Sequence, residues 1–164
     1  MNILNLAVGT LCTLIGPPGC GKSTFAARYP DSWRVCLDTY RNLATDSEAD
    51  QSATPVAVEI QNLLLDARLA RGRTTIADST NLQTHVRAGL VARARYWQRT
   101  PVAVLFDVPL SVVEAQNASR ERVVPLHVVC ELHQLLPTAD QLHDEGFTTV
   151  HLASDLTATT GGAR

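Results

Sequence analysis

The chain has 164 residues, of which 45% are hydrophobic and 18% charged, and its formal net charge is −2. This size and composition are typical of one globular domain. The slight negative charge argues against a protein that coats nucleic acid nonspecifically. Because no apolar run reaches membrane-spanning length and the start lacks the basic residues of a signal peptide, we expect a cytoplasmic protein with no membrane partner.

The first expected elements surround a glycine-rich loop. Residues 16–23 read Gly-Pro-Pro-Gly-Cys-Gly-Lys-Ser, which is the phosphate-binding P-loop pattern G-x-x-x-x-G-K-[ST]. The apolar run 11–15 predicts a buried strand before the loop, and residues 23–29 predict a helix after it, ended by Pro30. A true P-loop requires this strand, loop and helix.

The parts of this loop suit a nucleoside triphosphate such as ATP. Glycines let the backbone fold around an anion with its N–H groups pointing inward. Lys22, the only lysine of the chain, is a mobile point charge for the β- or γ-phosphate, and the Ser23 hydroxyl can ligate Mg²⁺. The residues of the loop that we expect to bind the nucleotide are Gly16, Gly19, Cys20, Gly21, Lys22, Ser23 and Thr24.

The four cysteines include no C-x-x-C pair, which argues against a zinc site. Cys12 and Cys36 lie in expected strands and are interpreted as small core residues. Cys20 has two interpretations. It is either a thiol with a low pKa beside Lys22 or, as we prefer, a variable position of the P-loop motif.

Downstream, short apolar runs alternate with helical periodicity. The further expected strands cover residues 34–37, 73–77, 102–106 and 147–152. The expected helices cover residues 54–71, 82–97, 110–119 and 125–136, with a short one opening at 137–138. Thr54 and Pro55 are expected as N-cap and first helical residue of one helix, and Gly72 as the residue that ends it. Residues 42–52 are expected to lack regular structure.

This alternation predicts an α/β fold, a P-loop NTPase-type parallel sheet of about five strands with helices on both faces. Residues 1–153 would form the domain, with a helical lid at about 110–136, and residues 154–164 a frayed tail. Three expected strands end in an aspartate, namely Asp38, Asp78 and Asp107. Because ligands of such sheets bind beyond the carboxyl ends of the strands, we expect these carboxylates to lie beside the P-loop.

Asp38 and Arg41 are three residues apart, so a helical turn starting at Asp38 would place them on one face. Asp38 would then accept a proton from an acceptor hydroxyl while Arg41 holds a nearby phosphate. A local ion pair at a strand end is an equally good interpretation. Tyr40, between them, either stacks on a base or, as we favour, packs against the sheet.

Asp78 begins the sequence Asp-Ser-Thr-Asn, which also has more than one interpretation. Asp78 would support Mg²⁺, orient the P-loop serine or contact the substrate. Alternatively, one of these four residues caps the next helix.

Two groups of arginines are candidate ligands of phosphate. Arg120 and Arg122 follow the first helix of the expected lid and would close over the ATP phosphates, the alternative being a surface ion pair with Glu114 or Glu121. Residues 79–106 contain no acid, and the arginines among them are mostly expected on the solvated face of a helix. They are Arg87, Arg93, Arg95 and Arg99.

Together, G-P-P-G-C-G-K-S-T, D-x-x-R, D-S-T-N and N-x-x-R-x-R-x-V-P resemble the 5′-polynucleotide kinase family over residues 11–152. These are P-loop phosphotransferases of phages and of bacterial nucleic-acid end-healing enzymes. The resemblance implies transfer of the γ-phosphate of ATP, with Mg²⁺, to a 5′-hydroxyl end of DNA or RNA, preferably single-stranded. It implies a cytoplasmic location in a bacterium or an infected host.

The resemblance also implies a role for each matching residue. Lys22 and Ser23 would hold the ATP phosphates and Mg²⁺, and Asp38 would be the general base. Arg41 would bind the phosphate next to the reacting nucleotide, and Asp78 would support the acceptor site. Arg120 would stabilise the transferring phosphoryl group, so Lys22, Asp38 and Arg120 are the expected catalytic residues.

The chain departs from the family at two points. The lid often begins Arg-Asn, whereas this chain has Gln116-Asn117, so Arg122 would have to replace one cation. The D-x-D-x-T motif of a 3′-phosphatase is missing, which leads us to expect a stand-alone kinase. Two other functions stay open, a kinase for a small-molecule, tRNA-linked or modified-base hydroxyl and a nucleotide-binding switch without catalysis.

Overall fold

A computed structural model of the chain describes residues 3–120 and 122–158. Five parallel strands form one sheet in the order β2-β3-β1-β4-β5. They are Leu11–Ile15, Arg34–Val35, Thr75–Asp78, Pro101–Leu105 and Thr149–Leu152, numbered β1 to β5 along the chain. This confirms the predicted P-loop NTPase-type α/β fold. No helix in the described ranges is long and apolar enough to span a bilayer.

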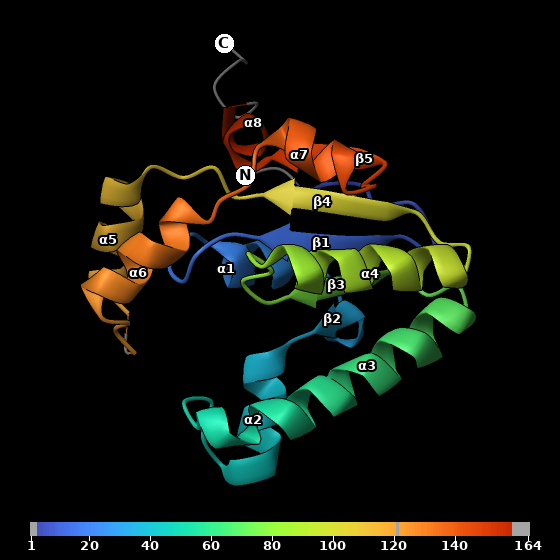
Figure 1. Cartoon of the computed structure of the whole chain (residues 1–164), viewed down its shortest axis with the longest axis horizontal. Coiled ribbons are helices and arrows are strands. Elements are labelled where there is room, and N and C mark those ends of the chain that lie inside the picture. The colour runs from blue at the N-terminus through green and yellow to red at the C-terminus, as the bar shows by residue number, and fades with distance from the viewer. Residues whose placement is uncertain (1–2, 121, 159–164) are drawn as a thin grey trace.

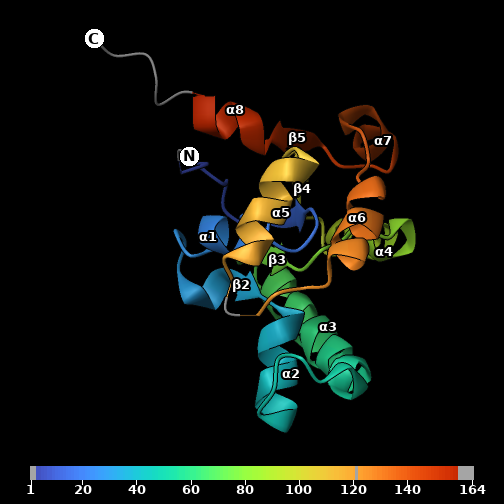
Figure 2. The same ribbon diagram turned by 90° about the vertical axis from the view of Figure 1, so that its left-hand side faces the viewer.

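The described residues form eight α-helices, which cover and extend this sheet (Figure 1). Numbered α1 to α8, they are Lys22–Ala26, Leu37–Thr45, Thr54–Ala70, Thr84–Tyr96, Leu110–Ala118, Leu126–Gln134, Ala139–Asp144 and Ala153–Ala158. Two 3-10 turns, η1 at Asp31–Trp33 and η2 at Gln51–Ala53, precede β2 and α3. Figures 1 and 2 show α5 and α6 beyond the carboxyl ends of the central strands, where the lid was predicted.

The core forms because alternate residues of the buried strands point to opposite faces of the sheet. Cys12 and Leu14 of β1 pack with Phe25 of α1 on one face. Leu11 of the same strand packs with Leu65 of α3 on the other face. Every residue of β1 is buried, as expected for a central parallel strand.

The second strand and its surroundings differ from the prediction. The run 34–37 yields only Arg34–Val35, because this edge strand pairs with β3 over two residues. Asp38 therefore lies in the first turn of α2 and not at a strand end. The helix continues to Thr45, into a segment expected to be irregular, and ends where Asp46 takes a left-handed conformation. Tyr40 of α2 is buried against the core, as favoured.

Boundaries of other elements also move, by one to three residues in α1, β3, β4 and α4. The helix α3 begins at Thr54 itself because η2 leads directly into it, so the prediction of Thr54 as the N-cap is wrong. Pro55 lies in the first turn of the helix and Gly72 has a left-handed backbone, as predicted. The fifth strand is shorter than 147–152 because Phe147 is buried in the core after the Gly146 turn.

Residues 153–158 form α8, not a frayed tail. Its start is held by Asp107, which accepts hydrogen bonds from the Ser154 amide and hydroxyl. Residues 159–164 of the predicted tail lie outside the described residues.

The buried thiol of Cys12 makes the stability depend on alkaline pH. Burial raises the pKa of this thiol to about 12 from 9.0. Above pH 9 the native state therefore holds a proton that the unfolded chain releases, so stability falls as pH rises. We expect Cys12→Ala to flatten the decline in unfolding free energy by about 1.4 kcal/mol per pH unit above about pH 9. Urea titrations under reducing conditions at several pH values would measure this, and equal slopes for both proteins would contradict it.

Candidate active site

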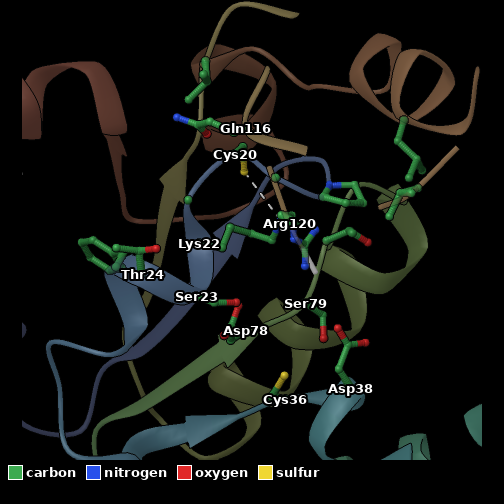
Figure 3. Close-up of a pocket in the computed structure, with 18 of the residues that line it drawn as sticks. Cys20, Lys22, Ser23, Thr24, Cys36, Asp38, Asp78, Ser79, Gln116 and Arg120 are labelled. Carbon is green, nitrogen blue, oxygen red and sulfur yellow. Dashed lines mark hydrogen bonds between the residues drawn. The ribbon is translucent and has the colours of Figure 1, made fainter. Parts of the chain in front are cut away.

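A cavity of about 1030 Å³ lies at the carboxyl ends of the strands. It is lined by the P-loop, the start of α2, the turn after β3, and the lid formed by α5, α6 and their connection. Figure 3 shows Lys22, Ser23, Asp38, Asp78 and Arg120 facing this space. Asp107 lines it as well, so all three predicted aspartates reach one edge of the sheet. The cavity volume is at the upper end of the roughly 300–1000 Å³ that pockets for one ligand span.

The P-loop has its predicted geometry. Gly19 and Gly21 have φ angles of +85° and +99°, which a residue with a side chain rarely adopts. Gly16 is required for space, since a Cβ atom there would lie 2.6 Å from Cys20 Sγ and 2.9 Å from Phe106 Cβ. Within the described part of the chain, the amides of residues 19–24 donate to no backbone carbonyl. A cradle of free amides is the arrangement that binds phosphate.

Lys22 is buried at the base of this cradle. Its ammonium donates to the carbonyl oxygens of Gly16 and Pro17, at 2.7 Å each, and lies 3.6 Å from Cys20 Sγ. It forms no salt bridge with any carboxylate of residues 3–120 and 122–158. A buried cation without a counter-ion is costly, so a bound phosphate would complete the site.

The Cys20 thiol fills the space behind the loop. It is 3% exposed and belongs to the core cluster that holds Phe25 and Phe106. Burial raises the pKa of Cys20, and the charge of Lys22 offsets this only in part. The interpretation of Cys20 as a thiol with a low pKa is therefore wrong, because desolvation outweighs the nearby cation.

Asp78 is buried at the end of β3 and paired with the neighbouring strand. Arg34 Nε lies 2.6 Å from its Oδ2 atom, and this ion pair raises the pKa of Arg34 despite the desolvation of the guanidinium. Figure 3 shows Asp78 next to Ser23. None of the residues from Asp78 to Asn81 caps the next helix, because α4 begins at Thr84 with Gln83 as its N-cap. This excludes capping and leaves the other three interpretations, in which Asp78 supports Mg²⁺, orients Ser23 or contacts the substrate.

Asp38 and Arg41 form the predicted pair on one face of α2. The guanidinium of Arg41 donates to Asp38 Oδ1 and, through Nε, to the Glu48 carbonyl oxygen at 2.9 Å. Arg41 is buried, whereas the Asp38 side chain is half exposed to the cavity. A carboxylate near the helix N-terminus is favoured by the helix dipole. The structure thus has a fixed arginine and an accessible carboxylate opposite the P-loop.

Two residues of the turn after β3 have roles that the sequence did not reveal. The buried amide of Asn81 donates to the Leu14 carbonyl oxygen at 2.8 Å, which ties this turn to the end of β1. Its φ angle of +48° is a conformation that asparagine tolerates better than most residues. The buried Ser79 hydroxyl has no hydrogen-bond partner among the described residues, and Figure 3 shows it facing Asp38.

The lid is attached to the P-loop through Asn117 of α5. Gly19 packs against this residue so closely that a Cβ atom would lie 3.3 Å from Asn117 Cβ. The Asn117 side chain donates to the Val124 carbonyl oxygen at 2.7 Å and accepts from the Val124 amide at 3.1 Å. These bonds close the segment that carries both lid arginines. Figure 3 shows Arg120 near Lys22, and Gln116 near Cys20.

Asn117→Ala should loosen this segment, because it removes two hydrogen bonds from a buried position. We expect trypsin to cleave after Arg120 or Arg122 about 5–30 times faster, which corresponds to a loss of about 1–2 kcal/mol in local stability. Mass spectrometry of early fragments would locate the cuts. Ser119→Ala, which removes only an exposed hydrogen bond to the Gln116 carbonyl oxygen, is the matched control. Equal cleavage of both variants would contradict this role.

The arginines of residues 87–99 do not line the cavity. Arg87 is not on a solvated face as expected. It is 3% exposed, forms a salt bridge with Glu145 at 2.6 Å, and donates to the Leu82 carbonyl oxygen at 2.6 Å. Arg93 pairs with Asp66. The absence of nearby acids in sequence was misleading because the partners come from distant segments.

The AAA domain family model matches residues 11–137. The chain belongs to this family. A chain in the structure of the Pnkp1/Rnl/Hen1 RNA repair complex matches with a TM-score of 0.69 and 21% identity, over 86% of this chain and 47% of that one. A second structure of the Pnkp1/Rnl/Hen1 complex matches with a TM-score of 0.58 and 25% identity, over 76% and 43%.

The chain therefore spans less than half the length of these two solved chains. None of the curated proteins matches its sequence. The likeness to the first structure concerns the fold. Together with the family match, it agrees with the P-loop domain that the motifs predict.

Proposed function

We propose that this protein is an ATP-dependent kinase that phosphorylates the 5′-hydroxyl end of a polynucleotide. The observation that carries the proposal is that the Asp38–Arg41 pair and the P-loop line one cavity from opposite sides. Phosphoryl transfer needs a donor site, a carboxylate near the acceptor oxygen, and cations on the migrating group. The residues that line the cavity would supply all three, whereas a nucleotide-binding switch would need only the first.

On the donor side, the amides of residues 19–24, which donate to no backbone carbonyl in the described part of the chain, and the Lys22 ammonium would bind the ATP phosphates. Arg120 would stabilise the charge on the transferring phosphoryl group from the lid. Mg²⁺, where bound, supplies positive charge to the β- and γ-phosphates. Ser23 and Asp78 are the residues that would hold it, since a hydroxyl and a carboxylate are oxygen ligands of the kind that Mg²⁺ prefers.

On the acceptor side, Asp38 would accept the proton of the 5′-hydroxyl as this oxygen attacks the γ-phosphorus. Arg41 would bind the phosphate that follows the terminal nucleoside. Because Arg41 is buried and bonded to both Asp38 and Glu48, its guanidinium is oriented before the substrate arrives. Such preorganisation lowers the entropy cost of placing the hydroxyl in line.

The direct test is to incubate the protein with γ-labelled ATP, Mg²⁺ and short DNA and RNA single strands that end in a 5′-hydroxyl. We expect label at the 5′ end, and Asp38→Asn should lower kcat at least about 100-fold, because general base catalysis contributes 10²–10⁴-fold. ATP binding should persist in the variant. If Asp38→Asn labels the strands as fast as the wild-type protein does, Asp38 is not the general base. The absence of any transfer, with ATP bound, would exclude a polynucleotide acceptor.

A further inference from the structure

Two arginines from opposite walls of the cavity meet at one backbone oxygen. Arg41 Nε donates to the Glu48 carbonyl oxygen at 2.9 Å, and an Nη atom of Arg122 approaches the same oxygen at 3.4 Å. Arg41 belongs to α2, and Arg122 to the connection between α5 and α6. The lid thus contacts the segment after α2 beside the Asp38–Arg41 pair.

The charges at this point are not balanced. The Asp38 carboxylate compensates Arg41. In the described part of the chain no carboxylate forms a salt bridge with Arg122, whose contact is the neutral carbonyl group. The side chains of Asp38, Arg41 and Arg122 therefore carry a net charge of +1 together. A phosphodiester carries one negative charge, and its bonds to guanidinium groups are about twice as strong as neutral hydrogen bonds.

The contact that Arg122 makes also differs from the positions of the other two lid residues. Gln116, where the lid of the resembled family often has its first arginine, lies near Cys20 of the P-loop (Figure 3). Arg120 lies near Lys22 in the same view. Arg122 instead contacts the Glu48 carbonyl oxygen. The same oxygen accepts a hydrogen bond from Arg41, which also donates to Asp38. Its contact thus places Arg122 beside the general-base candidate and not at the position of the missing cation.

We propose that Arg122 binds the acceptor, where it and Arg41 hold the phosphodiester that follows the 5′-terminal nucleoside. This inference rests on the proposed function and specifies its substrate as a hydroxyl with a neighbouring phosphate. The phosphate accepts hydrogen bonds from Arg122 and from the Nη1 atom of Arg41, while Nε and Nη2 of Arg41 keep their bonds to Glu48 and Asp38. Binding of a phosphorylated acceptor therefore also fastens the lid to α2.

The test compares steady-state kinetics with three acceptors, a nucleoside, the same nucleoside 3′-monophosphate and a short oligonucleotide. We expect Arg122→Ala to raise KM about 10-fold for the two acceptors that carry a phosphate, as for loss of a charge-assisted hydrogen bond. KM for ATP and for the nucleoside should stay within about two-fold. Arg122→Lys should restore part of the affinity. Arg71→Ala, which removes an exposed arginine bonded to the Ala67 carbonyl oxygen, is the control.

A higher KM for ATP alone, or an equal loss with all three acceptors, would overturn the proposal. A measurement of oligonucleotide binding without turnover distinguishes failure of this proposal from failure of the proposed function. With a non-hydrolysable ATP analogue present, oligonucleotide affinity should depend less steeply on salt in Arg122→Ala, by about one phosphate contact. If the wild-type protein neither binds nor phosphorylates oligonucleotides, both proposals fail. If it does both and Arg122→Ala behaves identically, only the role of Arg122 fails.

Discussion

Lys22→Met should lower kcat for phosphoryl transfer on the order of 10³-fold and weaken ATP binding, because it removes the only cation inside the P-loop cradle. Methionine keeps the length and apolar stem of the side chain, so the buried space stays filled. The variant lacks the ammonium that bonds to the Gly16 and Pro17 carbonyl oxygens. Initial rates with labelled ATP and calorimetric titration with ATP would measure the two effects.

Thermal unfolding is the control for Lys22→Met. Removing a buried cation without a carboxylate partner also removes its desolvation cost, so we expect little loss of stability in the absence of nucleotide. ATP should raise the Tm of the wild-type protein more than that of the variant, since a ligand stabilises only the state that it binds. A variant with unchanged ATP affinity and a kcat within about 10-fold of wild type would contradict the assigned role.

The sequence was most informative where local patterns and buried strands coincide. The P-loop is a contiguous motif, so its glycine conformations and the position of Lys22 follow from local rules. Residues 11–15, apolar except for Thr13, form β1, and the apolar run 102–106 corresponds to β4, which is shifted by one residue to Pro101–Leu105; both strands end beside the site. Asp78 and Asp107 were correctly placed by this logic because parallel strands end at one edge of the sheet.

The predictions from the sequence fail where contacts between segments far apart in the chain determine the local structure. The edge strand β2 pairs with β3 over two residues, and α2 begins at Leu37 with Tyr40 packed in the core. Arg34 and Asp78 are 44 residues apart, and Arg87 and Glu145 are 58 apart. No periodicity predicts such pairs. Asn117 was visible as part of a lid motif, but its bonds to Val124 depend on how the loop folds back.

Arg120→Ala should lower kcat on the order of 10³-fold, the lower range for an arginine that stabilises a transferring phosphoryl group. The side chain is exposed and lies near Lys22, so its removal leaves no buried hole (Figure 3). We expect KM for ATP to change little, because the charge that Arg120 meets develops in the transition state. Steady-state rates at saturating acceptor would show this separation of kcat from KM.

The double variant Asn117→Ala/Arg120→Ala tests whether the lid positions this arginine. If Asn117 acts through Arg120, its removal should reduce kcat in the wild-type background but have little further effect once Arg120 is gone. Ser119→Ala should leave kcat unchanged in both backgrounds. Effects that multiply in the double variant would mean that Asn117 acts by another route, such as the path of the chain that its two bonds to Val124 fix. A lid that orients its arginine through the same residue that touches the P-loop would couple ATP binding to catalysis.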